Sequence, residues 1–335
     1  MKKKINILFL LIVSVFLSYS MQKKAYAVPI SPDKYFINIH PGETKTEELI
    51  IMGRKEMTGP VTLYLRPVGM KKIGETHDRS FYIPDPNDQS EPANWVHLSQ
   101  TTVTIHPGET LRVKWSITPS DVAQCGTNLA AILISTKDYN DNNKKKSPTE
   151  VELNKEVASQ IHVTINTNGK CNNKIHLQLL DFKVIKQKIL GLVSLPIYNY
   201  NNAQFETRVA NDGNLIARSP MGFITIQGPN IKKVQVPLNP DHYDIYPQTT
   251  RKFITTWHDE NYPDAGGFFK KLFYEITHWR FGRYSATLGI TKNTDTNIIT
   301  TVTFLIIPWR PFLTILVLIA GLFMYFKVKN KQNEK

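Results

Sequence analysis

Three groups of residues in the sequence have side chains that could do chemistry, and the first is a pair of histidines. His40-Pro41-Gly42-Glu43-Thr44 recurs as His106-Pro107-Gly108-Glu109-Thr110. Histidine is a common metal ligand, but no third ligand stands near this pair in the sequence. Pro followed by Gly suits the centre of a type II turn, in which Gly takes a positive φ. The repeat therefore predicts two equivalent turns between strands, and no metal site.

The second group is acidic. Trp257-His258-Asp259-Glu260 and the nearby Asp264 combine an imidazole with carboxylates. A glycosidase needs two carboxylates fixed across a cleft, which neighbours on one loop seldom provide. Nucleophile-elbow, zinc-protease, phosphate-loop and dinucleotide-binding motifs are all missing from the sequence. We expect an acidic loop at the end of a strand, no cofactor, and a protein that is not an enzyme.

The third group is the pair of cysteines, Cys125 and Cys171. They flank two consecutive predicted strands, 128–135 and 157–165. If these strands are antiparallel neighbours, the start of one lies beside the end of the next. This arrangement predicts a disulfide, which would stabilise the fold by about 3–4 kcal/mol in the chain-entropy model. Two buried free thiols, or a bond between molecules, are the alternatives.

The distribution of charge argues against nucleic acid as a partner. The chain has 335 residues and a formal net charge of +13. Residues 1–27 contribute +5 and the tail after Phe326 contributes +3, so the long stretch between them carries only +5. Much of the positive charge therefore belongs to signals that set membrane topology.

The N-terminal residues have the pattern of a secretory signal peptide. Lys2-Lys3-Lys4 precede an apolar run from Ile5 to Leu17, and Ala25-Tyr26-Ala27 forms a small-x-small cleavage site. We predict that residues 1–27 are removed and that the mature chain begins at Val28. An uncleaved N-terminal anchor is the alternative.

The C-terminal residues have the pattern of a membrane anchor. Phe312–Phe326 is uncharged and is followed by four lysines. As a helix this run covers about 22 Å, so spanning a core of roughly 30 Å requires extension at one end or both. Since lysines favour the cytoplasmic side, we predict a transmembrane helix over 309–328 and a cytoplasmic tail over 329–335. The expected location is the cell membrane, with a single pass and the N-terminal part outside; a buried helix of a soluble domain is the alternative.

The body of the chain has the pattern of an all-β protein with two immunoglobulin-like β-sandwich domains in tandem, over 28–171 and 172–308. The predicted strands of the first domain are 35–39, 48–51, 61–65, 102–105, 111–117, 128–135 and 157–165. Those of the second are 175–184, 204–210, 222–227, 232–237, 251–257, 283–290 and 298–307. Residues 128–135 are continuously apolar apart from their ends, which predicts a strand buried on both faces. Asn211–Asn214 predicts a tight turn of the hairpin type.

Two aromatic segments interrupt the strands. Gly69–Trp95 is polar and proline-rich and is predicted as the largest loop of the first domain. The aromatic residues considered there as ligand-binding candidates are Phe81, Tyr82 and Trp95. They could stack on sugar rings, or they could be the hydrophobic plug of a long connection.

The second segment, 267–279, predicts a helix inserted in the second domain. Four apolar residues have the helical spacing i, i+3, i+4, i+7, namely Phe269, Leu272, Phe273 and Ile276. Lys270, Lys271 and Glu275 are expected on the opposite face. The helix either caps the second sandwich or faces a membrane or a partner.

The order of these features resembles the WxL-interacting proteins of bacterial cell surfaces. The residues that carry the resemblance are Tyr35-Phe36-Ile37 leading to Pro41-Gly42, Pro107-Gly108, Ala130-Ala131-Ile132, Gly282-Arg283-Tyr284 and Phe304. The resemblance implies a first sandwich that binds peptidoglycan and a second that binds partner proteins. We therefore expect a membrane-anchored extracellular protein that attaches to cell-wall polymer, to a surface protein, or to both. The alternative is a scaffold or chaperone-like subunit of a membrane-associated complex, without glycan binding.

Overall fold

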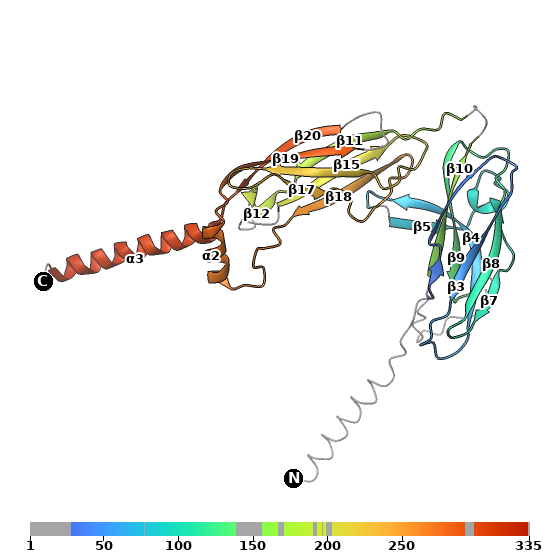
Figure 1. Ribbon diagram of the computed structural model, residues 1–335, viewed down its shortest axis with the longest axis horizontal. Helices are drawn as coiled ribbons and strands as arrows, with labels where there is room; N and C mark the ends of the chain where they lie inside the picture. The colour runs from blue at the N-terminus through green and yellow to red at the C-terminus, as the bar shows by residue number, and fades with distance from the viewer. Residues whose placement is uncertain are drawn as a thin grey trace, which may run out of the picture. The chain divides into compact units, whose positions relative to one another are not determined.

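The computed structural model describes residues 28–76, 78–138, 156–166, 171–189, 193–195, 197–198, 203–291 and 298–333 (Figure 1). The predicted signal peptide lies outside these residues. The chain divides into two compact units. The first comprises Met1–Met70, Phe81–Gln124 and Asn128–Ile165, and the second comprises Lys71–Ser80, Cys125–Thr127 and Asn166–Lys335. Each unit holds an immunoglobulin-like β-sandwich, which confirms the predicted all-β class.

The first sandwich consists of two sheets. One sheet has the order β1 (Ile30–Ser31), β3 (Lys45–Met52), β8 (Thr110–Ile117), β6 (Val96–Leu98). The other has the order β2 (Lys34–Ile39), β10 (Glu156–Ile165), β9 (Gly126–Ser135), β4 (Val61–Ile73), β5 (Asp78–Tyr82), and β7 (Thr102–Ile105) also pairs with β4. The 3-10 helix η1 (Pro92–Trp95) precedes β6. β2 pairs with β10 in parallel, from Lys34 opposite Gln160 to Ile39 opposite Ile165.

Strand β9 is buried on both faces, as predicted. Ala130 and Ile132 belong to the main core between the sheets, whereas Ala131 and Leu133 pack with Val68 in a smaller cluster. A strand in such a position cannot alternate between apolar and polar residues, which explains its continuous apolar sequence.

The two repeated motifs form the same turn, also as predicted. Gly42 and Gly108 have φ values of +74° and +75°. In the first turn the N–H of Glu43 donates to the carbonyl of His40 at 3.1 Å, and the His40 N–H donates to the Glu43 carboxylate at 3.0 Å. The second motif repeats both bonds, at 3.1 Å and 2.8 Å. The repeat is thus explained by turn formation.

The segment predicted as the largest loop of the first domain is partly a hairpin, so that prediction was wrong over its first half. β4 continues to Ile73, and the chain turns at Gly74, whose φ is +61°, into β5. The ring of Tyr82 lies directly over Gly69, where a Cβ would come within 2.2 Å of a ring atom. Gly69 thus makes room for a ring on the sheet.

The second sandwich also consists of two main sheets. The three-stranded sheet has the order β11 (Leu177–Val184), β15 (Ala203–Asn211), β18 (Thr249–Trp257). The five-stranded sheet has the order β14 (Ile197–Tyr198), β20 (Ile298–Ile306), β19 (Gly282–Thr291), β16 (Met221–Gln227), β17 (Val234–Pro237). β12 (Gln187–Ile189) and β13 (Val193–Leu195) form a separate pair. Aromatic rings fill the core, where the ring centroid of Phe304 lies 5.6 Å from that of Phe205 and 5.7 Å from that of Tyr284.

The turn at Asn211–Asn214 does not close a hairpin, so that prediction was wrong. β15 and β16, which flank it, belong to different sheets. The buried side chain of Asn211 accepts the N–H of Gly213 at 3.1 Å and donates to the carbonyls of Leu215 and Ile245 at 2.8 Å and 3.1 Å. These bonds stabilise a crossing from one sheet to the other, which uses the same turn residues as a hairpin.

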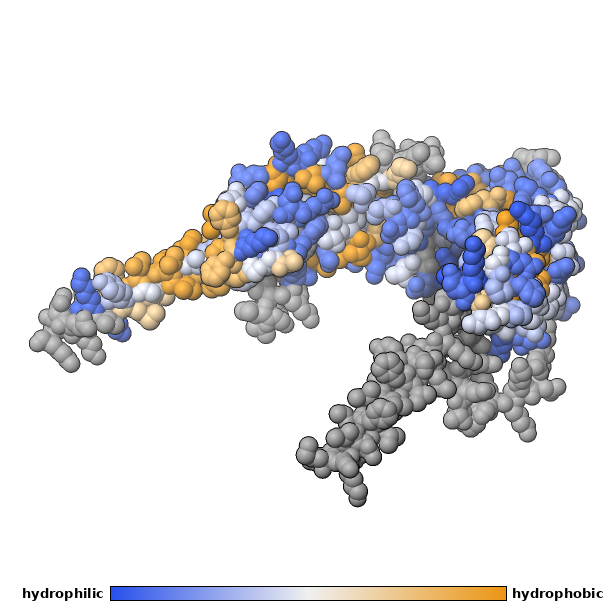
Figure 2. Space-filling view, turned by 60° about the horizontal axis from the view of Figure 1, so that its bottom comes forward, coloured by the Kyte–Doolittle hydropathy of each residue, from blue (hydrophilic) through white to orange (hydrophobic). Residues whose placement is uncertain are grey.

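The C-terminal helix α3 runs over Trp309–Asn333. Its stretch Trp309–Lys327, 19 residues long, is apolar enough to cross a membrane and is almost entirely unburied. The helix therefore extends the apolar run at both ends, and these residues cover about 28 Å. Pro311 is compatible with the first turn, where its missing N–H would have no helical partner. Figure 2 shows hydrophobic residues along most of this helix.

Candidate binding surfaces

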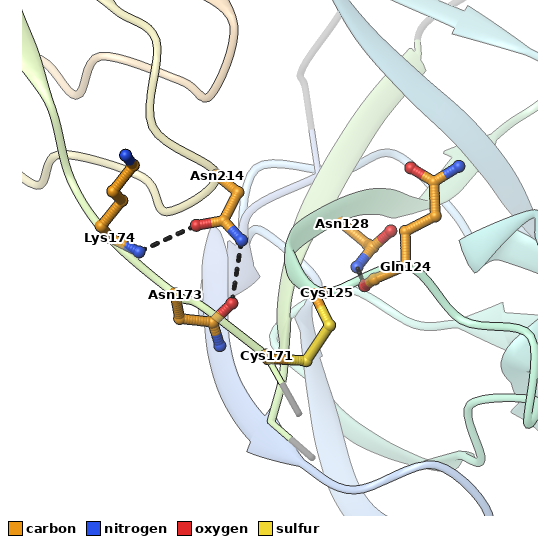
Figure 3. Close-up of a disulfide and its surroundings, with 7 residues drawn as sticks. All are labelled: Gln124, Cys125, Asn128, Cys171, Asn173, Lys174 and Asn214. Carbon is orange, nitrogen blue, oxygen red and sulfur yellow. Dashed lines mark hydrogen bonds between the residues drawn. A yellow bond between two sulfur atoms is a disulfide. The ribbon is translucent and has the colours of Figure 1, made fainter. Parts of the chain in front are cut away.

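The predicted disulfide is confirmed. Cys125 and Cys171 are bonded, with their Cα atoms 5.5 Å apart and a sequence separation of 46 (Figure 3). Beyond Cys171, the backbone N–H of Lys174 donates to the Asn214 side chain at 2.9 Å, and that side chain donates to Asn173 at 3.0 Å. The segment between the disulfide and β11 is thus held by hydrogen bonds against the turn at Asn214.

The three aromatic residues proposed to bind a ligand in the first domain do not form an open platform. Trp95 is buried in the core, and its indole N–H donates to the carbonyl of Gln89 at 2.8 Å. The Tyr82 hydroxyl donates to Glu91 at 2.9 Å, and burial together with this carboxylate raises the pKa of Tyr82 to about 12. Phe81 packs beside the small cluster on β9. These contacts favour the interpretation as a hydrophobic plug, because Trp95 has no ring face free for a sugar.

The carboxylates of the acidic loop after β18 make separate contacts with different partners. The His258 ring lies 3.1 Å from the Asp264 carboxylate. Asp259 accepts a bond from Arg280 at 2.5 Å and one from the Tyr274 hydroxyl at 3.3 Å. These carboxylates hold the loop in place. Within the described ranges, no group of three or more His, Cys, Asp or Glu side chains could hold a metal ion.

The predicted helical insert is confirmed as α2, Phe268–Thr277. Of the four apolar residues predicted to share one face, only Leu272 is buried. Phe269, Phe273 and Ile276 are 80%, 70% and 54% exposed, and they stand at i, i+4 and i+7 on one side of the helix. We call these three residues the apolar stripe of α2.

Glu275 was predicted on the polar face of α2, and this was wrong. The side chain is completely buried, and its carboxylate forms an ion pair with Arg310 in the first turn of α3. The Tyr262 hydroxyl donates to the same carboxylate at 2.9 Å and accepts a bond from Arg310 at 2.8 Å. Burial of the Tyr262 hydroxyl raises its pKa, and the hydrogen bond to the Glu275 carboxylate raises the pKa further. Glu275 follows Leu272 by three residues, so a helix places both on the same side.

Aromatic rings join α2 and the segment after it to the start of α3. The ring centroids of Phe268 and Trp309 are 6.1 Å apart, and Phe312 lies 5.8 Å from Trp279 and 5.5 Å from Phe281. Figure 1 shows α2 at the beginning of α3. The ion pair and these rings together hold α2 at the end of α3 from which the apolar stretch starts.

The sequence analysis did not identify Tyr262 and Arg310, the two partners of the Glu275 carboxylate. A signal for Arg310 was present, since an arginine at the start of an apolar stretch needs a partner or water. Tyr262 gave no signal, because its role depends on a loop that folds back onto α2.

The outer face of the five-stranded sheet carries a second apolar surface. Phe223 on β16 stands opposite Gly289 on β19, which stands opposite Ile299 on β20. Phe223 is 45% exposed and Ile299 is 71% exposed. A Cβ at Gly289 would meet no atom within 4 Å, so the backbone between them is open. We call Phe223, Gly289 and Ile299 the apolar row.

On one side of the apolar row the next row of the same sheet face is polar. Two residues from Phe223 along β16, Thr225 stands opposite Thr287 on β19, which stands opposite Thr301 on β20. The hydroxyl oxygens of Thr287 and Thr301 are 2.9 Å apart. Polar side chains therefore bound the apolar row on this side, while on the other side Met221, 44% exposed, lies two residues before Phe223 on β16.

Comparison with known proteins gives distant structural similarity only. No protein-family model and no curated protein matches the chain. The class 5 fimbriae chaperone CfaA is similar with a TM-score of 0.38 and 10% identity, over 84% of this chain and 99% of that chain. For the CupB2 chaperone of Pseudomonas aeruginosa the TM-score is 0.34 with 8% identity, over 82% and 99%. The E. coli chaperone DraB has a TM-score of 0.33 with 10% identity, over 84% and 97%. Scores this low do not carry a function from one protein to another.

Proposed function

We propose that this chain is a membrane-anchored scaffold that holds a partner protein outside the cell, on the outer face of its second sandwich. The observation that carries the proposal is the apolar row, in which Phe223 and Ile299 are exposed on either side of the open backbone at Gly289. Apolar residues that adjoin one another on the surface of a folded domain are a feature of interaction sites.

The chemistry of the row suits a protein better than a sugar. A sugar site combines aromatic ring faces with several polar side chains that fix the hydroxyls, and the row has one ring and no polar side chain. The gap at Gly289 would admit an apolar side chain of a partner between Phe223 and Ile299. The resemblance to WxL-interacting proteins supports the same assignment, because their second sandwich is described as binding partner proteins.

The anchor part of the proposal assigns α3 to the membrane. Its apolar stretch is long enough to cross, and the lysines that follow it favour the cytoplasmic side. The sandwiches would then stand outside. Attachment of the first sandwich to cell-wall polymer stays a prediction of the resemblance, and the packing of Trp95 gives it no support.

The test is capture of membrane proteins from the source cells by the full-length chain, using a double variant of the apolar row. Phe223→Ser with Ile299→Thr should lower recovery of a specific partner at least tenfold, which corresponds to about 1.4 kcal/mol. Thr225→Ser with Thr301→Ser is the matched control on the neighbouring row and should bind normally.

Equal recovery with both variants would overturn the assignment to this face. A parallel arm uses isolated cell-wall sacculi. Saturable binding that survives moderate salt would favour wall attachment, because purely ionic attraction weakens with salt.

A further inference from the structure

We propose that α2 lies in the headgroup region of the membrane, with the apolar stripe of Phe269, Phe273 and Ile276 inserted among the lipids. The inference deepens the proposed function and rests on its anchor part, the assignment of α3 to the membrane. It commits the stripe to one occupant, a lipid surface.

The first argument is the division of α2 into two sides. Leu272 and Glu275 face the protein and are buried, while the stripe faces away from it. Three large apolar side chains on one side of a short helix are costly in water. They are the usual feature of a helix that lies in a membrane interface. Lys270 is exposed beside the stripe, where its ammonium group could reach lipid phosphates.

The second argument is position. The Glu275 carboxylate, the Arg310 guanidinium and the Tyr262 hydroxyl form one hydrogen-bonded cluster at the first turn of α3. A stretch of 19 residues that begins at Trp309 reaches the hydrocarbon core within its first turns. α2 is therefore held at the level of the headgroups.

The third argument is the aromatic composition around this level. Trp279 and Trp309 are 37% and 41% exposed, and both contact rings of α2 or α3. Tryptophan is enriched where membrane proteins pass from water to hydrocarbon. Two part-exposed indoles at the start of α3 fit an interfacial location. A docking site for a soluble partner would not explain why these residues gather at the start of α3.

The test is site-directed spin labelling of the full-length chain in lipid nanodiscs that contain anionic lipid. A label at Phe273→Cys reports the stripe, and Ile276→Cys is the second position in case the first disturbs folding. Leu318→Cys in the middle of α3 and Thr301→Cys on β20 serve as lipid and water references. Cys125 and Cys171 are bonded to each other and leave the new thiol unique. The readout is accessibility to oxygen relative to a water-soluble nickel chelate.

We expect the stripe positions to have accessibility ratios close to that of Leu318 and far from that of Thr301. If Leu318 reads as lipid-exposed while both stripe positions read as water-exposed, the inference is overturned and the membrane anchor stands. If Leu318 itself reads as water-exposed, the anchor fails and the inference fails with it. A stripe shielded from both oxygen and the chelate would show a protein partner in place of lipid and would also overturn the inference.

Discussion

Two aromatic segments of this chain end in opposite environments. Residues 69–95 turn their rings inward, where Trp95 joins the core and Tyr82 covers a glycine of the adjacent strand. Residues 267–279 leave Phe269 and Phe273 largely exposed. The number of aromatic residues therefore does not decide whether a segment is buried.

The difference lies in what the neighbouring elements offer. The first segment has a sheet beside it, with Gly69 leaving space for a ring. The second has α3, whose own apolar surface is unburied. Because α2 is fixed to α3, both helices share the same surroundings. The exposed rings of α2 therefore give information about the environment of α3 as well.

The largest expected effect is on the inward segment. Trp95→Ala should destabilise the first sandwich by about 3–5 kcal/mol, because it leaves a large cavity in the core. Ile83→Ala is the control, since Ile83 belongs to the same segment but is 73% exposed, and it should cost less than about 0.5 kcal/mol. Native-state hydrogen exchange of the first sandwich in the full-length chain measures both. Equal effects would show that the segment does not pack as described.

The next effect is on the attachment of α2. Glu275→Gln should cost about 3 kcal/mol, because it leaves the Arg310 charge without its buried partner. Faster amide exchange in α2 would report its release from α3, and Lys270→Gln on the same helix should leave exchange unchanged. Replacing both partners by Glu275→Leu and Arg310→Met should recover most of the loss. Failure of the double variant to recover would mean that more than the ion pair was removed.

A smaller effect concerns the hydrogen bond of Tyr82. Tyr82→Phe should cost about 1 kcal/mol near neutral pH. The pKa of Tyr82 is raised from 10.0 to about 12 in the folded chain, so its contribution is complete below pH 10 and is lost as pH rises towards 12. The difference in unfolding free energy between wild type and variant should therefore shrink over that interval. A constant difference up to pH 12 would contradict the assigned cause.

The smallest effect belongs to the apolar stripe. Phe269→Ala and Phe273→Ala should each change the unfolding free energy in detergent by less than about 0.5 kcal/mol, because neither side chain packs inside the protein. A loss of 2 kcal/mol or more, of the order found for core positions, would place the two segments in the same class and remove the contrast between them.

The sequence predicted what depends on neighbouring residues. The repeated His-Pro-Gly-Glu-Thr motif contains everything its turn needs, so both copies were predicted correctly. The cysteine pairing followed from two adjacent strands. The continuous apolar run of β9 likewise indicated burial on both faces.

Features that depend on distant residues were missed or misread. The segment that begins at Gly69 was predicted as a loop from its polar, proline-rich composition, whereas the ring that packs over Gly69 comes 13 residues later, at Tyr82. Asn211–Asn214 has the composition of a hairpin turn, but the strands on either side of it, β15 and β16, belong to different sheets, and Asn211 bonds to the distant carbonyl of Ile245. Glu275 looked like a solvent-exposed charge because its partner, Arg310, is 35 residues away.

The parallel pairing of β2 with β10 has a consequence for the order of folding. β2 is the first strand of that sheet in the sequence and lies at its edge. Its partner residues, Gln160–Ile165, belong to β10, which is the last strand of the same sandwich to be synthesised. The edge residues Lys34–Ile39 therefore stay without their ladder until nearly the whole first domain exists. Closing so long a loop is slow relative to local hairpins. A chain stopped anywhere before Gln160 would expose an unpaired apolar strand, Tyr35–Ile39, and would be prone to pair with another copy instead.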